Sequence, residues 1–306
     1  MTEPSDRPGS SLRTWAEMIK FTHSVFALPF ALIATFLAGR YLEGGYPTVT
    51  HIVLIVVCMV AARSAAMTFN RIADYAIDSR NPRTARRPLQ AGHLSLIQAW
   101  LFLCLSSATF ALGCFSFYFL LPTPNRWPML LGGPVLAYLF TYSFAKRFTR
   151  YSHFMLGSAI AISPVAAWIA VDPGSLGWPA VLLSGAVTLW IGGFDIIYAC
   201  QDIEVDRREG LHSLPARLGP ARALYIARSS HLLTVVLLVF VGVTAQLGWL
   251  YYLGVTLVAG LLLVENLSVR ADDFSKVNLA FFTINGIVSV VMSAFAIADV
   301  VISHAG

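Results

Sequence analysis

Long apolar segments recur along the whole chain and are separated by short polar loops. Each segment approaches the roughly 20 residues that an α-helix needs to cross about 30 Å of hydrocarbon. The pattern predicts about nine transmembrane helices, at residues 21–41, 49–70, 96–121, 128–144, 153–171, 178–200, 229–247, 250–264 and 277–303. No polar block between them is large enough to form a second hydrophobic core. We therefore expect an all-α integral membrane protein with one transmembrane domain over residues 1–306.

The composition agrees with this interpretation and excludes several classes of protein. The chain is 57% hydrophobic and 12% charged, and the charged share is about half of that in soluble globular domains. The net charge of +5 comes from basic residues in short loops between spans, where membrane topology explains them better than nucleic-acid binding does. All four cysteines lie in apolar segments without a CxxC pair, so neither a disulfide framework nor a zinc site is expected.

The distribution of lysine and arginine predicts the orientation of the helices. If the N-terminus lies inside, only Arg40 and Arg126 fall in the outer loops, and Arg63 lies within a span. All the remaining basic residues then fall on the inner side. By the positive-inside rule, we expect a multi-pass protein of the inner (cytoplasmic) membrane whose large basic loops face the cytoplasm.

Two clusters of acidic residues end two of the predicted spans on this cytoplasmic side. In NRIADYAID, the side chains of Asn70, Asp74 and Asp78 are spaced at i, i+4 and i+8, so they share one face of a helix. A second motif, DIIYACQDIEVD, ends the sixth apolar segment and contains Asp195, Asp202 and Asp206. Acidic helix ends and basic loops are usually solvated surface or topology signals, but that explanation accounts poorly for a repeated pattern at matching depths.

The two clusters together indicate a site for a cation and a phosphate group. Carboxylates that face each other across a bundle repel strongly unless cations lie between them. Ligands that are all oxygen, with an amide among carboxylates, suit Mg²⁺, which usually binds through one or two carboxylates together with substrate phosphates. Basic residues follow both clusters and the fourth span, and a diphosphate would balance their charge: Arg83, Arg86, Arg87, Lys146, Arg147, Arg207 and Arg208.

Arg63 lies inside the second predicted span, away from these loops. Seven residues before Asn70, it points within about 20° of the same direction, toward the interior of the bundle. A charged residue at this depth is a candidate functional residue, although an arginine can also snorkel or bind backbone carbonyls. We expect Arg63 to bind the carboxylate of an acidic acceptor.

These motifs resemble those of the UbiA superfamily of intramembrane prenyltransferases over essentially the whole chain. NxxxDxxxD is matched at Asn70, Asp74 and Asp78, and the second motif is similar to DxxYAxxDxxxD. YSFAKRFT resembles the family's YPxxKR segment, with Ser143 in place of the usual proline. KFTHSVFALPF, NPRTARRPLQAG and GFDIIYACQDIEVDRREGLHS resemble the 4-hydroxybenzoate polyprenyltransferase branch and its relatives in the futalosine route to menaquinone.

The resemblance implies a ring-like bundle of transmembrane helices around a central cavity, and an enzyme that uses Mg²⁺. The expected reaction is transfer of a polyprenyl group from its diphosphate to a ring carbon of a hydroxylated aromatic acid. The acceptor is either of the 4-hydroxybenzoate type or 1,4-dihydroxy-6-naphthoate, and the residues do not separate the two. The resemblance assigns Mg²⁺ to one set of residues and the diphosphate to a second: Asn70, Asp74, Asp78, Asp202 and Asp206; Lys146, Arg83 and Arg87.

Three further residues are candidates for catalysis: Arg63, Asp195 and Tyr198, of which the last two would orient the acceptor or relay its ring proton. A transporter of an anionic amphiphile is the rival class of function. Transporters of that kind bind their substrate near the middle of the bilayer, whereas both acidic clusters here lie at one face. The position of the clusters therefore favours an enzyme that works at the cytoplasmic surface.

Overall fold

The computed structural model describes residues 12–19, 26–274, 277 and 283–305. Within this part of the chain, the regular secondary structure is helical apart from one isolated bridge between Arg270 and Asp273. Among the described residues, eight helical stretches are long and apolar enough to cross a membrane. They are α3 (Val49–Ala73), α5 (Leu96–Phe119), α6 (Trp127–Thr141), α7 (Ser152–Val171), α8 (Trp178–Ala199), α11 (Pro220–Thr244), α12 (Trp249–Ser268) and α14 (Asn285–Ala305). α6 reaches this length together with the 3₁₀ segment that continues it to Arg147. The predicted all-α membrane fold is confirmed, and the chain is a multi-pass membrane protein.

The predicted boundaries differ from the structure mainly at the first, seventh and ninth spans. The first is represented by the shorter helix α2 (Leu28–Gly39), and residues 21–25 lie outside the described part of the chain. The seventh begins nine residues earlier than predicted, since Gly219, with φ +79°, and Pro220 start α11 before the apolar run begins. Most of the predicted start of the ninth span, residues 278–282, also lies outside the description.

The predicted tight connection between the seventh and eighth spans is present and is bound to the rest of the bundle. α11 ends at Thr244 and α12 begins at Trp249. The backbone N–H of Gly248 donates to Asp299 Oδ2 at 2.7 Å, and Arg40 Nη1 donates to the carbonyl of Ala245 at 2.7 Å. Side chains from α14 and from the end of α2 therefore satisfy backbone groups that would otherwise be unpaired at these helix ends.

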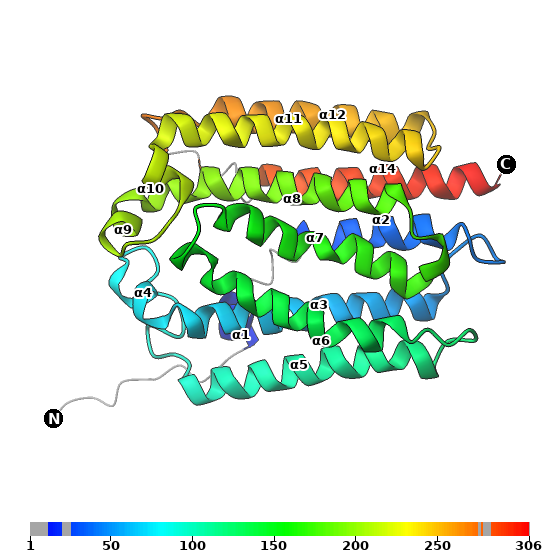
Figure 1. Ribbon diagram of the computed structural model, residues 1–306, viewed down its shortest axis with the longest axis horizontal. Coiled ribbons are helices and arrows are strands. Elements are labelled where there is room, and N and C mark those ends of the chain that lie inside the picture. Colours follow the sequence, from blue (N-terminus) through cyan, green and yellow to red (C-terminus); the bar gives the residue numbers. More distant parts are fainter. Residues whose placement is uncertain (1–11, 20–25, 275–276, 278–282, 306) are drawn as a thin grey trace.

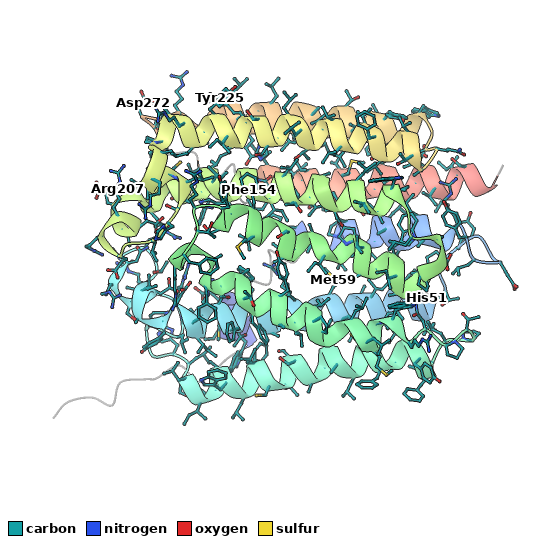
Figure 2. The ribbon with its side chains drawn as sticks, in the orientation of Figure 1. His51, Met59, Phe154, Arg207, Tyr225 and Asp272 are labelled. Atoms are coloured by element: carbon teal, nitrogen blue, oxygen red, sulfur yellow. The ribbon has the colours of Figure 1, made fainter. Side chains whose placement is uncertain are left out.

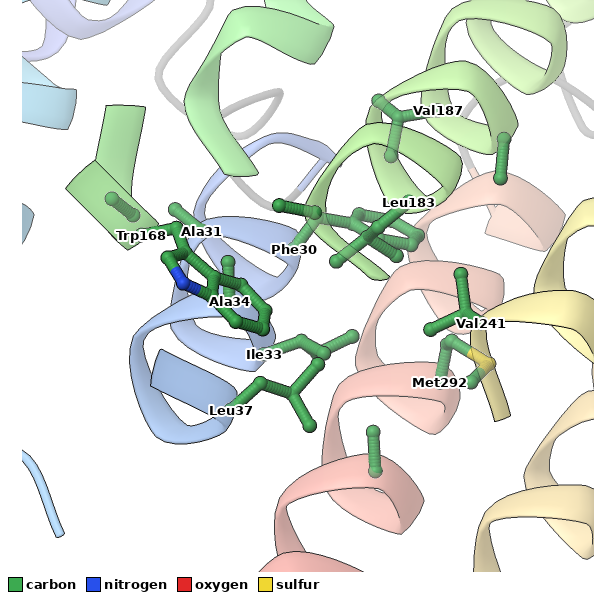
Figure 3. Packing of buried hydrophobic residues seen from close by; sticks show 14 of the residues in the cluster. Phe30, Ala31, Ile33, Ala34, Leu37, Trp168, Leu183, Val187, Val241 and Met292 are labelled. Atoms are coloured by element: carbon green, nitrogen blue, oxygen red, sulfur yellow. The ribbon is translucent and has the colours of Figure 1, made fainter. Parts of the chain in front are cut away.

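The interior of the bundle is packed where α2 meets α7, α8 and α14 (Figure 3). The rings of Phe30 and Trp190 lie 5.2 Å apart between their centroids. α7 and α8 approach closely because Gly157 has no side chain: a Cβ there would collide with the carbonyl of Thr188. The outer surface is apolar as well, as the exposed Trp249 and Tyr225 illustrate, which suits a surface in contact with lipid. Figure 2 labels Tyr225 on the outer side of α11.

Short helices gather at one end of the bundle (Figure 1). They are α4 (Tyr75–Arg80), α9 (Ile203–Arg208) and α10 (Leu214–Leu218). Figure 2 shows Arg207 at this end and His51 at the opposite end. The amino-terminal helix α1 (Leu12–Met18) lies beside α5, where Trp15 stacks on Phe102 with ring centroids 4.6 Å apart. Both acidic motifs lie at the end formed by the short helices.

Candidate active site

Asp74 lies at the junction between α3 and α4, where the long helix stops. Its backbone angles, φ −95° and ψ 7°, are outside the helical region. The N–H of Asp74 nevertheless donates to the carbonyl of Asn70, and the N–H of Asp78 donates to the carbonyl of Asp74. We predicted one continuous helix face; the helix is instead interrupted at Asp74, but these two bonds preserve the four-residue spacing.

The carboxylate of Asp74 is buried among cations. Only 3% of the residue is exposed. Lys146 Nζ lies 2.5 Å from its Oδ2 and Arg147 Nη2 lies 3.4 Å from its Oδ1, while Asn70 Nδ2 donates to Oδ2 at 3.3 Å. Lys146 and Arg147 come from a 3₁₀ segment, η2 (Tyr142–Arg147), directly after α6. The motif at the end of α3 and the basic segment after α6 thus form one site.

Asp78 forms a second buried ion pair one turn further on. Arg87 Nη1 lies 2.5 Å from its Oδ2, and Arg71 Nη1 lies 3.9 Å from the same atom. Arg71 is itself 6% exposed and donates through Nε to the carbonyl of Met18 in α1. An unpaired carboxylate at this depth would be strongly unfavourable, so each of these aspartates requires a positive partner.

The second motif begins on α8 and continues beyond its end. α8 stops at Ala199, and Asp202 follows in the short segment η4 (Cys200–Asp202). Arg83 binds Asp202 through two bonds, from Nε to Oδ1 at 2.9 Å and from Nη2 to Oδ2 at 2.5 Å, and its Nη1 donates to the hydroxyl of Tyr198 at 2.8 Å. Asn81 Nδ2 also donates to Asp202 Oδ1, at 3.2 Å.

The loops that follow the two motifs are tied together at their outer edge. Arg80 donates to both carboxylate oxygens of Glu209, and these hydrogen bonds lower the pKa of Glu209. The N–H of His212 donates to the carbonyl of Lys146 at 2.7 Å. The first loop, the second loop and the segment after α6 are therefore connected directly, and this holds the basic side chains close to both acidic clusters.

Asp206 and Asp195 flank the Asp202 pair. Asp206 lies on α9, half-buried, with a hydrogen bond to Ser213 and with Asp202 and Lys146 as charged neighbours. Asp195 lies on α8, where its Oδ2 is 2.7 Å from His153 Nδ1. The sequence motifs predict both aspartates as residues of this site, and their roles there stay predictions.

An apolar cavity of about 380 Å³ begins beside this charged cluster. It is lined by one face each of α3, α5, α6 and α7, and its lining runs along α3 from Ile55 to Met67, about 18 Å at 1.5 Å per residue. Arg63 and Tyr142 are the polar residues at its end nearest the short helices. The expected central cavity is thus present, between these helices.

Arg63 is placed as the sequence suggested, on the inner face of α3. Its Nε is buried and has no hydrogen-bond partner among the residues that the structure describes. Tyr142 is close enough to Arg63 to interact with it electrostatically. Tyr142 also interacts electrostatically with Asp74 and Asp195. Tyr142 therefore lies between the charged cluster and the cavity. A buried guanidinium with an unused donor is suited to an anionic partner.

The donor set is compatible with a hard divalent cation that is shared with a substrate. Over the described residues, no group of three His, Cys, Asp or Glu side chains forms a ready metal site. Mg²⁺ seldom needs such a cage, because phosphate oxygens of a substrate usually complete its shell. The buried carboxylates of Asp74 and Asp78, together with the amide of Asn70, supply the oxygen ligands that this cation prefers.

Two of the arginines that were expected to surround the acidic clusters bind other groups instead. Arg207 Nε donates to the carbonyl of Ala216, and Arg208 binds the carbonyl of Arg80 and lies near Glu209. Sequence reasoning also missed Asn81 and His153 as partners of the acidic clusters. Asn81 could have been suspected from its position three residues after Asp78, whereas His153 gave no signal beyond being a polar residue in the first turn of an apolar span.

Several known proteins are similar to this chain over most of its length. The model of the UbiA prenyltransferase family matches residues 27–287. The 4-hydroxybenzoate octaprenyltransferase of Pseudomonas fluorescens (strain Pf0-1) is 33% identical over 252 residues, which cover 82% of this chain and 80% of that protein. The enzyme of the same name from Pseudomonas aeruginosa (strain LESB58) is 34% identical over 230 residues, covering 75% and 74%.

Solved structures show the same fold. The apo structure of a UbiA homologue from Aeropyrum pernix K1 superposes with a TM-score of 0.75 and 29% identity, covering 92% of this chain and 98% of that chain. A UbiA homologue from Archaeoglobus fulgidus bound to GPP and Mg²⁺ gives a TM-score of 0.69 at 18% identity, covering 94% and 99%. With a family match over most of its length, this chain belongs to the UbiA prenyltransferase family.

Proposed function

We propose that this protein transfers a polyprenyl group from polyprenyl diphosphate to a ring carbon of a hydroxylated aromatic acid of the 4-hydroxybenzoate type. The observation that carries the proposal is the junction of a buried acid–base cluster with an apolar cavity that has an arginine at its charged end. The names of the relatives support the benzoate-type acceptor. By the positive-inside rule, the charged end faces the cytoplasm and the protein lies in the inner membrane.

Lys146, Arg83 and Arg87 are suited to bind the diphosphate while remaining anchored to the protein. Arginine has five N–H donors and lysine has three. Arg83 uses three on Asp202 and Tyr198, and Arg87 uses one on Asp78. The unused donors are available for phosphate oxygens. Negative charge grows on the leaving diphosphate as the allylic carbon–oxygen bond breaks, so these fixed cations stabilise the transition state more than the ground state.

Asn70, Asp74, Asp78, Asp202 and Asp206 are the residues that we assign to Mg²⁺. When bound, the ion adds positive charge beside the departing diphosphate. The carboxylates of Asp74, Asp78 and Asp202 are held in place before any substrate arrives, because each is already paired with a cation.

We assign the acceptor to the end of the cavity beside the charged cluster, between Arg63 and Asp195. Arg63 would bind its carboxylate, while Asp195 or Tyr198 would orient its ring or accept the ring proton. The apolar walls keep water away from the allylic cation until the electron-rich ring carbon attacks it.

The assay that tests this function uses purified protein in lipid vesicles with Mg²⁺ and a polyprenyl diphosphate. A panel of acceptors includes 4-hydroxybenzoate, 1,4-dihydroxy-6-naphthoate and benzoate without a hydroxyl. We expect diphosphate release together with a carbon-prenylated product from a hydroxylated acid, and none from plain benzoate. Product from the naphthoate alone would reassign the acceptor, whereas transport without any product would support the rival class.

Arg63→Ala is expected to raise the KM for the aromatic acid about 10–100-fold, because a hydrogen bond to a charged group contributes about 1.5–3 kcal/mol. The KM for the polyprenyl diphosphate is expected to stay within about 2-fold of the wild-type value, since Tyr142 separates Arg63 from the cations that we assign to the diphosphate. Initial rates over a matrix of both substrates measure the two constants. An unchanged acceptor KM and turnover would exclude the assignment of Arg63.

Ala166→Phe is expected to restrict the length of the prenyl chain that the enzyme accepts. Ala166 lines the cavity about 20 Å along α7 from its first residue, so a larger side chain there fills the deep end. We expect kcat/KM for octaprenyl diphosphate to fall about 10-fold, given overpacking costs of about 1–3 kcal/mol, and that for geranyl diphosphate to change little. Leu105→Phe, at an exposed position on α5, is the control; equal losses for both chain lengths would contradict the assignment.

A further inference from the structure

His153 is a buried imidazole beside the active site that the reaction above does not use. It lies in the first turn of α7 and is 3% exposed. Its Nδ1 is 2.7 Å from Asp195 Oδ2, and its Nε2 is 3.2 Å from the backbone nitrogen of Leu214. The ring therefore joins three parts of the site: α7, α8 and the start of α10.

The two partners determine which nitrogen of His153 carries the proton. The backbone N–H of Leu214 can only donate, so Nε2 accepts. The proton of the neutral imidazole is then on Nδ1, where it is donated to the carboxylate of Asp195. Because each ring nitrogen has its own partner, the ring cannot turn over without breaking a hydrogen bond. His153 thus fixes the orientation of the Asp195 carboxylate and is the hydrogen-bond partner of its Oδ2.

The other oxygen of Asp195 is left for a further partner. Within the described residues, Oδ1 has no hydrogen bond, and 23% of the side chain is exposed. Asp195 is an electrostatic neighbour of Tyr142, as is Arg63. Oδ1 of Asp195 therefore lies at the same end of the cavity as Arg63, whose guanidinium we assign to the carboxylate of the acceptor.

The close packing of α7 and α8 holds this pair in place. A Cβ at Gly157 would collide with the carbonyl of Thr188, and a Cβ at Gly192 would lie 2.6 Å from the ring of Phe154. Both glycines lie within about one turn of the contact between His153 and Asp195, on its side away from the short helices. The contact is therefore set by two rigid helices and not by a loop.

We propose that His153 is a positioning residue that orients Asp195 to accept the proton from the acceptor ring. The inference rests on the proposed function. As the allylic carbon–oxygen bond breaks, its electron pair leaves with the diphosphate, and a ring carbon supplies the pair for the new carbon–carbon bond. The pair of the ring C–H bond then restores aromaticity, and the proton passes to the free oxygen of Asp195.

The test compares His153→Leu with His153→Gln in the full-length protein. Leucine fills space without hydrogen bonds, whereas the amide of glutamine has one donor and one acceptor, as the neutral imidazole has. We expect His153→Leu to lower kcat about 10–100-fold, as loss of an orienting partner typically does, with the KM for polyprenyl diphosphate within about 2-fold. His153→Gln is expected to recover most of the loss.

Two further measurements separate positioning from packing. A role in packing alone predicts that His153→Gln fails like His153→Leu and that the KM for the diphosphate rises as Tm falls; that pattern would overturn the inference. In ¹⁵N-histidine-labelled protein, NMR should find the proton of His153 on Nδ1, and a proton on Nε2 would also overturn it. A normal kcat in His153→Leu would remove this inference alone, whereas a wild-type protein that prenylates no acceptor would remove the proposed function as well.

Discussion

Asp74→Asn is expected to lower kcat for prenyl transfer about 10³-fold, equivalent to about 4 kcal/mol of transition-state stabilisation. The carboxylate of Asp74 is buried and contacts Lys146, Arg147 and Asn70. Asparagine keeps the shape but removes the charge. The cation site would lose an anionic ligand, and Lys146 would lose the partner that holds it beside the diphosphate.

Initial rates of diphosphate release and product formation, measured on purified protein, check this expectation. Glu43→Gln is the matched control, because it makes the same kind of change at an exposed position in the loop before α3. It should leave the rate unchanged. If Asp74→Asn kept a rate within 10-fold of the wild type, Asp74 could not be a ligand on which catalysis depends.

Chelation is expected to produce the second large effect. EDTA should reduce prenyl transfer to the uncatalysed background, and added Mg²⁺ should restore it, since the charge on the leaving diphosphate would otherwise be only partly compensated. The fold should survive, because Asp74 and Asp78 keep Lys146, Arg147 and Arg87 as partners. We therefore expect the Tm to change by only a few degrees, roughly the effect of losing a weakly held ligand.

The same titration distinguishes catalysis from folding. Rates and thermal unfolding are followed in parallel as EDTA and then Mg²⁺ are added. Full activity in excess EDTA would exclude the metal, and Lys146, Arg83 and Arg87 would then carry all of the compensating charge. A large fall in Tm together with loss of activity would instead assign the metal a structural role.

The local features of this protein were predictable because they depend on neighbouring residues. The length of the apolar segments predicted the transmembrane helices, since backbone groups in lipid must be paired within the helix itself. The four-residue spacing of Asn70, Asp74 and Asp78 follows from helix geometry, and it survives the break at Asp74 through two backbone bonds. The start of α11 was predicted too late because Arg222 and Arg228 give its first turns a polar composition.

The sequence by itself therefore determined the membrane fold, the shared end of the bundle at which the two acidic clusters lie, and the residue types of the candidate site. Only the tertiary structure decided their pairing. Arg83 meets Asp202 across 119 positions and His153 meets Asp195 across 42, contacts that depend on how α3, α7 and α8 pack. The cavity beside NRIADYAID likewise exists only because four helices each turn one face toward the same space. Helix periodicity is local, whereas the distance between two helices is set by every side chain between them.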